Sequence, residues 1–483
     1  MADNPLHKLM NPRSIAVMGA SSNITRMGSV ILTAIISGKF NGPVYPVHPK
    51  EDRICGLKAY RRLKELPETP ELLILVIPTL LVPDILEEAG EMGIDRAIII
   101  TAGYDEVKSD EGRNLQNRIN KIVAKYGIRY VGPNCIGIYN AFASLNTTVF
   151  PNKLPAGNIG MISHSGTYLS HMFPYLESLQ FNFGEGISLG NASSIDTIDA
   201  MEYFEERDDI KVISMYLEGM HRADKFIETA KRISLKKPIV ALYVGGTEEG
   251  ARSSLSHTAA ITVEDSVVDA AFRQSGVIRA EGIEELLDFA WAFAYQPLPK
   301  GDRMAIVSVS GGPASSMADA ISRCGLKLPR FSQGIQDAIR KHLPHTGACV
   351  NPVDITYSMN EDAFARHIPE IVLRSDEIDG LFIYGMMSFK WVFEYKDILH
   401  NEMLNSLDLN VLEPATVKKA KDIVRYLQTY NKPILGSTFQ NQTDPIIKAF
   451  RQEGIPVFSG PERSIKTMSA MNKYRQYLEK RAK

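Results

Sequence analysis

The stretch Ser14-Ile-Ala-Val-Met-Gly-Ala-Ser-Ser22 decides the fold of this chain. A short apolar run ends there in a turn of small residues, and an apolar helical stretch begins near Val30. Similar runs recur along the sequence, separated by helical periodicity such as that of residues 83–92. Runs without polar alternation are typical of strands buried on both faces of a parallel sheet. The sequence therefore predicts an α/β protein built on parallel sheets.

The length of 483 residues predicts about three domains of ~150 residues. Two polar, proline-containing breaks, at 150–157 and 295–301, place the domains at residues 1–148, 149–298 and 299–483. The expected strands are Ser14–Met18, Pro43–Val47, Leu72–Ile77, Arg96–Thr101 and Arg129–Val131, then Ile159–Ile162, Phe183–Ile187, Val212–Leu217 and Pro238–Val244, then Arg303–Ser310, Gly380–Tyr384 and Pro433–Gly436. A charged helix is expected near 461–483.

The composition is that of an ordinary soluble globular protein, with 44% hydrophobic and 23% charged residues. Because the 54 basic residues are balanced in number by 56 acidic ones, the net charge is near zero and we expect no nucleic-acid partner. The four cysteines form no CxxC pair, which favours a reducing cytoplasm and neither a disulfide framework nor a zinc site. The start of the chain has no signal-peptide pattern, and no apolar run approaches the ~20 residues that cross a bilayer. We expect a cytoplasmic protein that does not bind membranes.

The turn after Met18 predicts an anion site, because a strand, a small-residue turn and a helix start expose backbone N–H groups to a phosphate. The strict GxGxxG spacing of dinucleotide sites is absent. The second strand ends in Val47-His-Pro-Lys50, which presents cations where NAD sites usually carry an acid. Such a site suits a ligand with an extra phosphate, either NADP or coenzyme A. The alternative is a plain βα turn with a surface lysine.

Three expected strand ends of the second domain carry polar chemistry. They are the turn Ser163-His-Ser-Gly-Thr167, the acid Glu218, and Gly245-Gly246 with a loop expected over residues 248–256. Ligands of parallel sheets gather at the carboxyl ends of strands, so these segments are expected to lie close together. The alternative for each alone is structural: a helix cap, a salt-bridge partner and a glycine turn.

His257, in Ser256-His-Thr258, is the predicted nucleophile. It has no metal-ligand partner at i+3 or i+4 and no nucleophile elbow, but a lone imidazole can carry a phosphoryl group. One ring nitrogen attacks while an acceptor holds the proton of the other, and Glu218 could be that acceptor. The alternative is an ordinary structural histidine, which is also what we expect of His164 and His171.

These features occur together with further motifs along nearly the whole chain. In this combination the sequence resembles the nucleoside-diphosphate-forming acyl-CoA synthetases, relatives of succinyl-CoA ligase, and in particular the α-type subunit of the ADP-forming acetate–CoA ligases. The motifs that carry the resemblance are Gly19-Ala-Ser-Ser22, Tyr45-Pro-Val-His-Pro-Lys50, Thr101-Ala-Gly-Tyr-Asp-Glu106, Gly132-Pro-Asn-Cys-Ile-Gly137, Ser163-His-Ser-Gly166, Leu189-Gly-Asn191 with Asp196, Glu218, Ser256-His-Thr-Ala259, Gly311-Gly-Pro313 and Asn351-Pro-Val-Asp354.

The resemblance implies a Rossmann-like CoA-binding domain followed by two flavodoxin-like domains of the succinyl-CoA-ligase type. It implies coenzyme A as substrate, no metal in this chain, and Mg-ATP or ADP on a separate ATP-grasp β-type subunit, with α2β2 as one expected assembly. The implied residues are His257 and Glu218 for catalysis, Ser163, Ser165, Gly166, Thr167, Gly311 and Gly312 for phosphate, and Gly19, Ser21, Ser22, Arg26, Lys50, Pro78, Gly103 and Asn134 for CoA.

The resulting hypothesis is an acyl-CoA synthetase in which phosphate displaces CoA near Asn134 and His257 then takes the phosphoryl group. Helices starting near Ser163 and Gly311 would neutralise it from opposite sides, and a mobile segment over 245–256 would carry it to the partner. Departures from the family pattern, such as His164 and Ala259 in place of the family's Gln and Gly, leave the acyl group open. A non-catalytic CoA-binding regulatory subunit and an NADP-linked oxidoreductase remain the alternatives.

Overall fold

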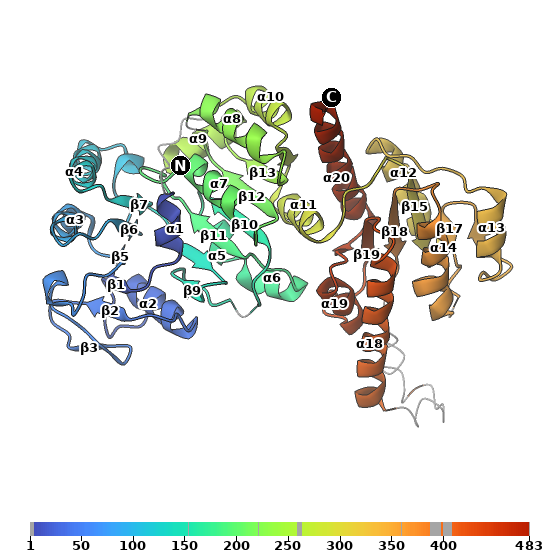
Figure 1. Cartoon of the computed structure of the whole chain (residues 1–483), viewed down its shortest axis with the longest axis horizontal. Helices are drawn as coiled ribbons and strands as arrows, with labels where there is room; N and C mark the ends of the chain where they lie inside the picture. Colours follow the sequence, from blue (N-terminus) through green and yellow to red (C-terminus); the bar gives the residue numbers. More distant parts are fainter. Residues whose placement is uncertain are drawn as a thin grey trace. The chain divides into compact units, whose positions relative to one another are not determined.

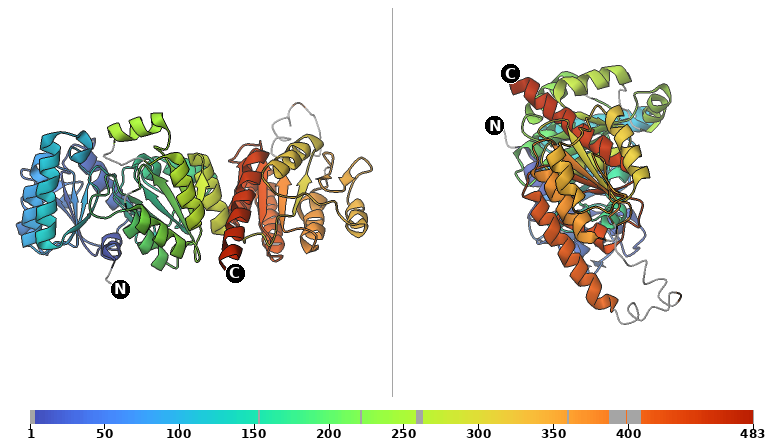
Figure 2. Two further views of the ribbon diagram at one scale, coloured as in Figure 1. Left: turned by 90° about the horizontal axis from the view of Figure 1, so that it is seen from above. Right: turned by 90° about the vertical axis from the view of Figure 1, so that its right-hand side faces the viewer.

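The computed structural model describes residues 4–152, 154–220, 222–257, 263–358, 360–386, 398 and 408–482, with the backbone alone for 253–257 and 409. The chain forms two compact units (Figure 1). Unit 1 comprises Met1–Glu177 and Asn182–Leu286, and unit 2 comprises Ser178–Phe181 and Leu287–Lys483. Within each unit, helices flank the sheets on both faces (Figure 2).

The first sheet of unit 1 has five parallel strands in the order β2-β1-β5-β6-β7. Its strands lie where the apolar runs predict them, and β5 is buried along its whole length because helices cover both faces. The elements of this region are α1 (Pro5–Met10), β1 (Ile15–Met18), α2 (Met27–Ser37), β2 (Val44–Val47), β3 (Arg53–Ile54), β4 (Leu57–Lys58), η1 (Leu63–Glu65), β5 (Leu72–Leu75), η2 (Thr79–Leu81), α3 (Val82–Glu91), β6 (Arg96–Ile99), η3 (Asp105–Val107), α4 (Asp110–Tyr126) and β7 (Arg129–Val131).

The second sheet of unit 1 has the order β14-β13-β12-β10-β11-β8-β9, parallel from β14 to β11. The antiparallel strands β8 and β9 precede residue 148, yet they pair in this second sheet. The domain boundaries predicted from the sequence remain a prediction. The elements are β8 (Ile138–Asn140), β9 (Leu145–Asn146), β10 (Ile159–Ser163), α5 (Thr167–Ser170), α6 (Phe173–Leu179), β11 (Glu185–Ser188), α7 (Thr197–Glu206), β12 (Val212–Leu217), α8 (Ala223–Ile233), β13 (Ile239–Tyr243), α9 (Glu248–His257), α10 (Asp265–Ser275), β14 (Ile278–Ala280) and α11 (Ile283–Tyr295).

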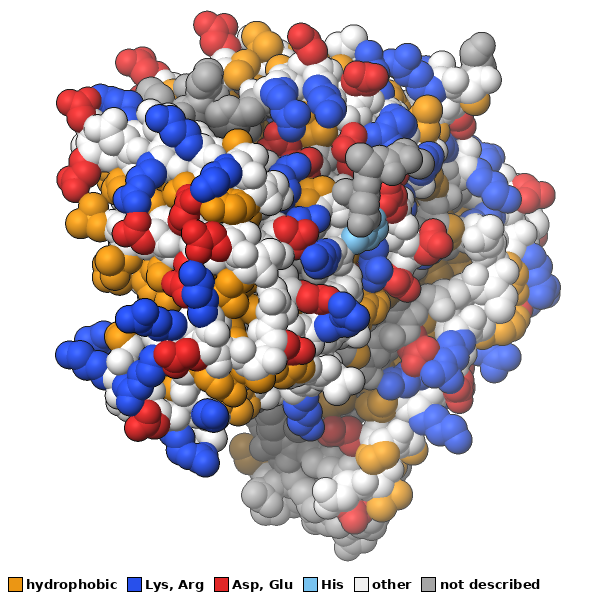
Figure 3. All heavy atoms as spheres, turned by 60° about the vertical axis from the view of Figure 1, so that its left-hand side comes forward, with side chains coloured by type: hydrophobic (Ala, Val, Ile, Leu, Met, Phe, Trp, Pro, Cys, Tyr) orange, Lys and Arg blue, Asp and Glu red, His pale blue; other side chains and the backbone are white. Residues whose placement is uncertain are grey.

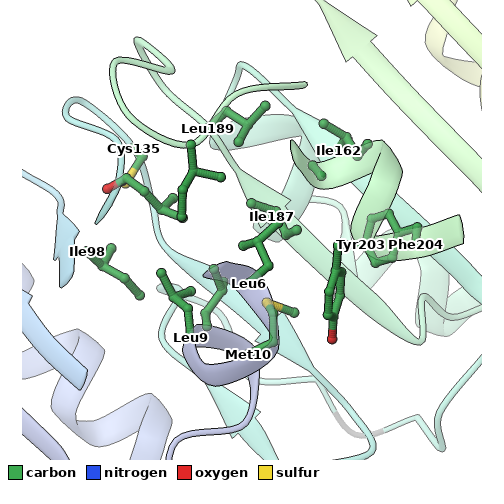
Figure 4. Close-up of a cluster of buried hydrophobic side chains, with 14 of the residues drawn as sticks. Leu6, Leu9, Met10, Ile98, Cys135, Ile162, Ile187, Leu189, Tyr203 and Phe204 are labelled. Atoms are coloured by element: carbon green, nitrogen blue, oxygen red, sulfur yellow. The ribbon is translucent and has the colours of Figure 1, made fainter. Parts of the chain in front are cut away.

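Helix α1 joins the two sheets of unit 1 through one hydrophobic core (Figure 4). Its side chains Leu6, Leu9 and Met10 are fully buried and pack in a cluster with Ile98 of β6 and Ile187 of β11. Burying three such side chains contributes about 1.5–3 kcal/mol each. The carboxyl ends of both sheets are therefore held in one compact unit.

Unit 2 contains a third sheet of the order β16-β17-β15-β18-β19-β20, parallel except for β16. The α/β class predicted for all three regions is confirmed. The elements of unit 2 are β15 (Met304–Ser308), α12 (Gly311–Arg323), α13 (Gln333–Arg340), β16 (Ala348–Cys349), β17 (Val353–Asp354), η4 (Ala363–His367), α14 (Ile368–Arg374), β18 (Gly380–Tyr384), α18 (Leu409–Gln428), β19 (Ile434–Thr438), α19 (Pro445–Gln452), β20 (Val457–Ser459) and α20 (Pro461–Ala482).

The loop predicted after Gly245-Gly246 is wrong, because residues 248–257 form helix α9. Glu248 and Glu249 lie in its first turn, where acidic side chains favour the helix dipole. The hydroxyl of Thr247 accepts the N–H of Gly250 at 3.0 Å and so caps the helix start.

The surface carries charges of both signs. Basic and acidic side chains are interspersed over the face in Figure 3, with hydrophobic ones showing between them at its left. Among the described helices, none has an apolar stretch of the length needed to cross a bilayer.

Candidate functional site

The turn after β10 presents a set of free amide donors. The Ser163 hydroxyl is fully buried and donates to the Ser165 carbonyl at 2.6 Å, which closes the turn. Within the described part of the chain, the N–H groups of residues 165–168 have no acceptor. A helix does begin close to the predicted start near Ser163, but α5 has only four residues and α6 follows separately. Anion binding at this turn therefore depends on individual amides rather than on a long helix dipole.

Glu218 directly follows β12, the strand next to β10. Its Oε2 atom is buried and has no hydrogen-bond partner among the described residues. The Tyr216 phenol hydrogen-bonds the same carboxylate, and burial followed by the nearby Glu218 charge raises the pKa of Tyr216. A buried oxygen without a donor costs free energy, so the site favours a ligand or side chain that brings a proton to it.

His164 contacts the main chain of Glu218. Its Nδ1 accepts the Glu218 N–H at 3.2 Å, and its Nε2 lies 3.1 Å from the Thr197 hydroxyl. His171, by contrast, caps α5 and packs edge-on against Phe150, as a structural residue would. Sequence reasoning missed the contact of His164, because no spacing signal links residues 164 and 218.

The backbone of His257 ends α9, and its side chain lies outside the described residues, as do Thr258 and Ala259. After these residues the chain returns at Val263, whose N–H donates to the Tyr243 hydroxyl at the end of β13 at 2.9 Å. Val263 is six positions after His257, with five residues between them, which limits the distance between the two residues to about 20 Å. The chain around His257 is therefore tied at both ends to the carboxyl edge of the second sheet. Helix α9 also lies beside η3 of the first sheet's edge.

The first glycine turn is closely packed. Gly19 has a φ of +99°, and a Cβ there would lie 2.0 Å from the Val76 carbonyl oxygen. The Ser22 N–H is not free but donates to the Glu51 carboxylate at 2.8 Å, which occupies the predicted phosphate position at this amide. Ser21 is buried and hydrogen-bonds within the turn. This turn accepts an anionic group, and a phosphate would have to displace Glu51.

Two cations stand near this turn without acidic partners. Arg26 precedes α2 and Lys50 follows β2; both are exposed, and neither forms an ion pair with any described residue. Pro78 is exposed at the end of the strand next to β1. Large exposed apolar side chains accompany these residues at the ends of β1 and β5, a feature that sequence reasoning missed: Ile24 (72% exposed), Leu80 (59%) and Leu81 (52%).

A chain of hydrogen bonds links the first sheet's edge to the second. The Asn134 amide donates to the Asn191 carbonyl oxygen at 3.2 Å, and the Asn191 amide donates to Glu106 at 2.5 Å. Buried Glu106 in turn accepts the Gly103 N–H at 2.5 Å. The structure thus brings together the predicted residues Gly103 and Asn134.

The segment after Asn134 also reaches the turn that follows β10. A Cβ added at Gly166 would lie 2.7 Å from the Cβ of Ile136, so the two segments touch. Cys135, between them, is buried, and burial raises the pKa of its thiol to about 12, which indicates a structural thiol. The predicted thioester and phosphate residues therefore lie on adjoining segments of unit 1.

Unit 2 repeats the turn geometry at the end of β15. The Ser308 hydroxyl donates to the Ser310 carbonyl at 2.7 Å, and α12 begins at Gly311 with 13 residues. The N–H groups of Gly311 and Gly312 have no acceptor among the described residues, and both glycines are exposed. The Asp354 carboxylate, however, lies beside Gly311, where a Cβ would meet its Oδ2 at 3.0 Å.

Beside this turn, unit 2 has a cavity of about 530 Å³. Its walls are mostly apolar and include Val309, Ile355, Phe364, Met386, Ile423 and Phe450. Among the described residues, no cluster of three or more His, Cys, Asp or Glu side chains could hold a metal ion.

Comparison with known proteins identifies the family. The family described as "CoA binding domain" matches residues 13–141, and "Succinyl-CoA ligase like flavodoxin domain" matches residues 156–293. The α subunit of acetate–CoA ligase (ADP-forming) II of Pyrococcus furiosus is 38% identical over 376 residues, 78% of this chain and 81% of that protein. The α subunit of the corresponding enzyme I is 30% identical over 98% of this chain and 99% of that protein. The chain belongs to the ADP-forming acyl-CoA synthetase family.

The solved structures agree with this assignment. An acetyl-coenzyme A synthetase 1 of Ca. Korarchaeum cryptofilum, determined with phosphate and ADP, has a TM-score of 0.86 and 28% identity, and the match covers 99% of each chain. A Pyrococcus horikoshii protein has a TM-score of 0.82 and 30% identity, covering 98% of this chain and 99% of that one. Other relatives are longer: this synthetase chain spans 65% of the 4-hydroxybutyrate–CoA ligase (ADP-forming) of Nitrosopumilus maritimus and 49% of the acetate–CoA ligase (ADP-forming) of Methanocaldococcus jannaschii.

Two family motifs have structural roles in this synthetase. Gly190, with a φ of +55°, lets its loop approach Pro133, whose carbonyl oxygen would lie 2.3 Å from a Cβ. Asp196 caps α7 and forms an ion pair with Arg222. These residues hold the site together from outside the predicted reacting groups.

Proposed function

We propose that the chain is the α-type subunit of an ADP-forming acyl-CoA synthetase and carries a phosphoryl group on His257. The observation that carries the proposal is the pairing, at one sheet edge, of the unpartnered Glu218 oxygen with the free amides of residues 165–168. A carboxylate oxygen that lacks a proton donor, at the same sheet edge as amides that lack an acceptor, fits an imidazole and a phosphoryl group. The bond of Val263 to Tyr243 at the end of β13, six positions after His257, supports the proposal that His257 reaches this edge.

The proposed reaction has two steps on this chain. Phosphate attacks the thioester carbonyl of acyl-CoA, the C–S bond breaks, and CoA leaves as thiolate with an acyl phosphate remaining. A ring nitrogen of His257 then attacks the phosphorus, the P–O bond to the acyl group breaks, and the carboxylate leaves. Glu218 accepts the N–H of the other ring nitrogen and so stabilises the charged phosphoimidazole. The amides of residues 165–168 neutralise the phosphoryl oxygens.

CoA would bind along the edge of the first sheet. Arg26 and Lys50 are the unpaired cations for its phosphates, and the exposed Ile24, Leu80 and Leu81 offer apolar surface beside them. Pro78, Gly103 and Asn134 would line the path of the thioester arm to the turn that includes Ser163, Ser165, Gly166 and Thr167. Displacement of Glu51 would free the Ser22 amide of the Gly19 turn.

The nucleotide step would belong to a partner. The named relatives include α subunits, so we propose a separate ATP-grasp β-type subunit that binds Mg-ADP, accepts the phosphoryl group and forms ATP, with α2β2 as the assembly to test. The free amides of Gly311 and Gly312 are proposed as a second phosphate-binding position within unit 2.

The test needs no nucleotide and no partner. The chain is incubated with labelled inorganic phosphate and either acetyl-CoA or 4-hydroxybutyryl-CoA, the acyl groups of the named relatives' substrates. We expect acid-labile label on the wild-type chain and release of CoA thiol. His257→Ala should take up no label, while His171→Ala, its matched control, should label normally. Absence of label on the wild-type chain, with or without an ATP-grasp partner, would favour the non-catalytic CoA-binding subunit.

A further inference from the structure

His164 holds the end of β12 from two sides. Its own N–H donates to the Tyr216 carbonyl at 3.1 Å, and its Nδ1 accepts the Glu218 N–H at 3.2 Å. The parallel register pairs Ser163 with Tyr216, so the residue after each strand meets the other across the sheet edge. The ring is 7% exposed, which leaves it little freedom to move away. His164 therefore fixes where the main chain places the Glu218 carboxylate.

These contacts define the protonation state of the ring. A main-chain N–H can only donate, so Nδ1 must present a lone pair to Glu218. The ring is then neutral with its proton on Nε2, which donates to the Thr197 hydroxyl at 3.1 Å. A second proton on Nδ1 would point at the Glu218 N–H and break this contact.

We propose that His164 is a positioning residue for Glu218 and acts only as the neutral ring. The inference rests on the proposed function, because Glu218 is the group that it positions. On the acid side of neutrality, protonation of His164 releases the Glu218 main chain and moves the carboxylate away from the amides of residues 165–168. The synthetase then loses turnover without losing its CoA site, which lies on the other sheet.

The charged groups around the ring set where this loss occurs. Negative charge on Glu218 favours the protonated ring, while Asp196, next to Thr197, is paired with Arg222. Among the described residues, the other titratable groups on the elements that contact the ring include Tyr216 of β12, Tyr168 of α5, and Asp199, Glu202, Tyr203, Glu205 and Glu206 of α7. Asp199 is paired with Arg129, and Glu205 with Lys236.

The test compares two side chains of the same size, His164→Asn and His164→Leu. The Asn Oδ1 occupies the place of Nδ1 and can accept the Glu218 N–H at any pH, whereas Leu cannot accept it. Labelling from acyl-CoA and phosphate is measured against pH, and the maximal labelling rate constant and the half-saturating acyl-CoA concentration serve as kcat and KM. We expect Asn to keep near-wild-type kcat at neutral pH and to extend activity to lower pH than the wild type. Leu should lose about tenfold to a hundredfold in kcat with little change in KM.

A second variant covers the case in which His164→Leu does not fold, which thermal unfolding will show. Thr197→Val keeps the size of the side chain but removes the acceptor for Nε2–H, and should lower kcat by several-fold. Equal activity of the Asn and Leu variants, or an Asn variant with the wild-type acid limb, overturns the inference while wild-type labelling still supports the proposed function. A wild-type chain that takes up no label rejects the proposed function itself.

Discussion

The second and third sheets end their central strands in the same turn but surround it differently. In each, a strand-ending serine donates to the carbonyl two residues later, at 2.6 Å for Ser163 and 2.7 Å for Ser308. In unit 1 the neighbouring strand end brings Glu218, held by His164. In unit 2 the corresponding edge brings Asp354 and a largely apolar cavity of about 530 Å³. We therefore infer that the turn is a shared scaffold and that the neighbouring strand ends decide whether chemistry can occur there.

The largest expected difference between the carboxyl edges of the second and third sheets is in the labelling rate when the acid, Glu218 or Asp354, is replaced by its amide. Glu218→Gln should lower the rate of phosphohistidine formation by about 100-fold or more, because Gln keeps an acceptor oxygen but removes the negative charge that stabilises the charged ring. Asp354→Asn should change that rate by less than about tenfold, because Asp354 already accepts the Thr356 N–H at 2.8 Å as a turn residue. Labelling rates of the two variants measure this. Similar losses in both would break the comparison.

The next largest expected difference between the two turns is in how a glycine-to-alanine substitution changes stability. Gly166→Ala places a methyl group 2.7 Å from the Ile136 Cβ and should destabilise unit 1 by about 1–3 kcal/mol. Gly312→Ala meets nothing within 4 Å and should leave the stability unchanged or slightly higher, since Ala favours the helix. Denaturant unfolding, followed by far-ultraviolet circular dichroism, measures the free energy of unfolding of both variants. An unaffected Gly166→Ala would show that the turn can move away from Ile136.

Much of this arrangement follows from the sequence, for physical reasons. Strands such as β12 and β18 are buried on both faces, so their apolar runs predicted their position to the residue. The missed strands, such as β9 and β17, have two residues each and carry no periodicity. Residues 248–257 look like a loop because small and polar residues dominate, yet the Thr247 cap and two acidic residues start a helix there.

Some features of the candidate site could likewise be predicted from the sequence, and others could not. Strand-end residues such as Glu218 could be predicted, because parallel strands share one carboxyl edge. The contact of His164 with Glu218 could not, since it depends on the register of β10 against β12. The hydrogen bond from the Ser22 N–H to Glu51 joins the turn after β1 to the segment after β2, and no local sequence pattern predicts it.

The edge of the first sheet should bind substrate without taking part in phosphoryl transfer. Lys50→Ala should weaken CoA binding by several-fold up to about tenfold, because a cation that pairs with no described acid is removed from the proposed phosphate site. Calorimetric titration with CoA measures this, and Lys121→Ala, exposed on α4, is the matched control. NADP should not bind. Unchanged CoA affinity, or binding of NADP, would contradict this placement and favour the oxidoreductase alternative.

The smallest expected effect concerns the buried thiol of Cys135, beside the segment that contacts the turn after β10. Burial raises the pKa of Cys135 from 9.0 to about 12, so its thiolate is scarce below that pH and iodoacetamide should react far more slowly with it than with exposed Cys55. Because the unfolded chain loses this proton first, the stability of unit 1 should fall as pH rises from about 9 to about 12. Mass spectrometry of alkylated peptides at several pH values measures the reactivity. Fast labelling of native Cys135 near neutral pH would show that the segment between Asn134 and Ile136 is open.

The most direct measurement is to locate the phosphoryl group on the intact chain. The wild-type protein is labelled with acyl-CoA and phosphate, digested under alkaline conditions that preserve phosphohistidine, and its peptides are sequenced by mass spectrometry. The account predicts one modified residue, His257, whose yield falls in Glu218→Gln and survives in Asp354→Asn. A phosphoryl group found on another residue, or a yield that depends on Asp354 rather than Glu218, would contradict the assignment of the chemistry to the edge of the second sheet.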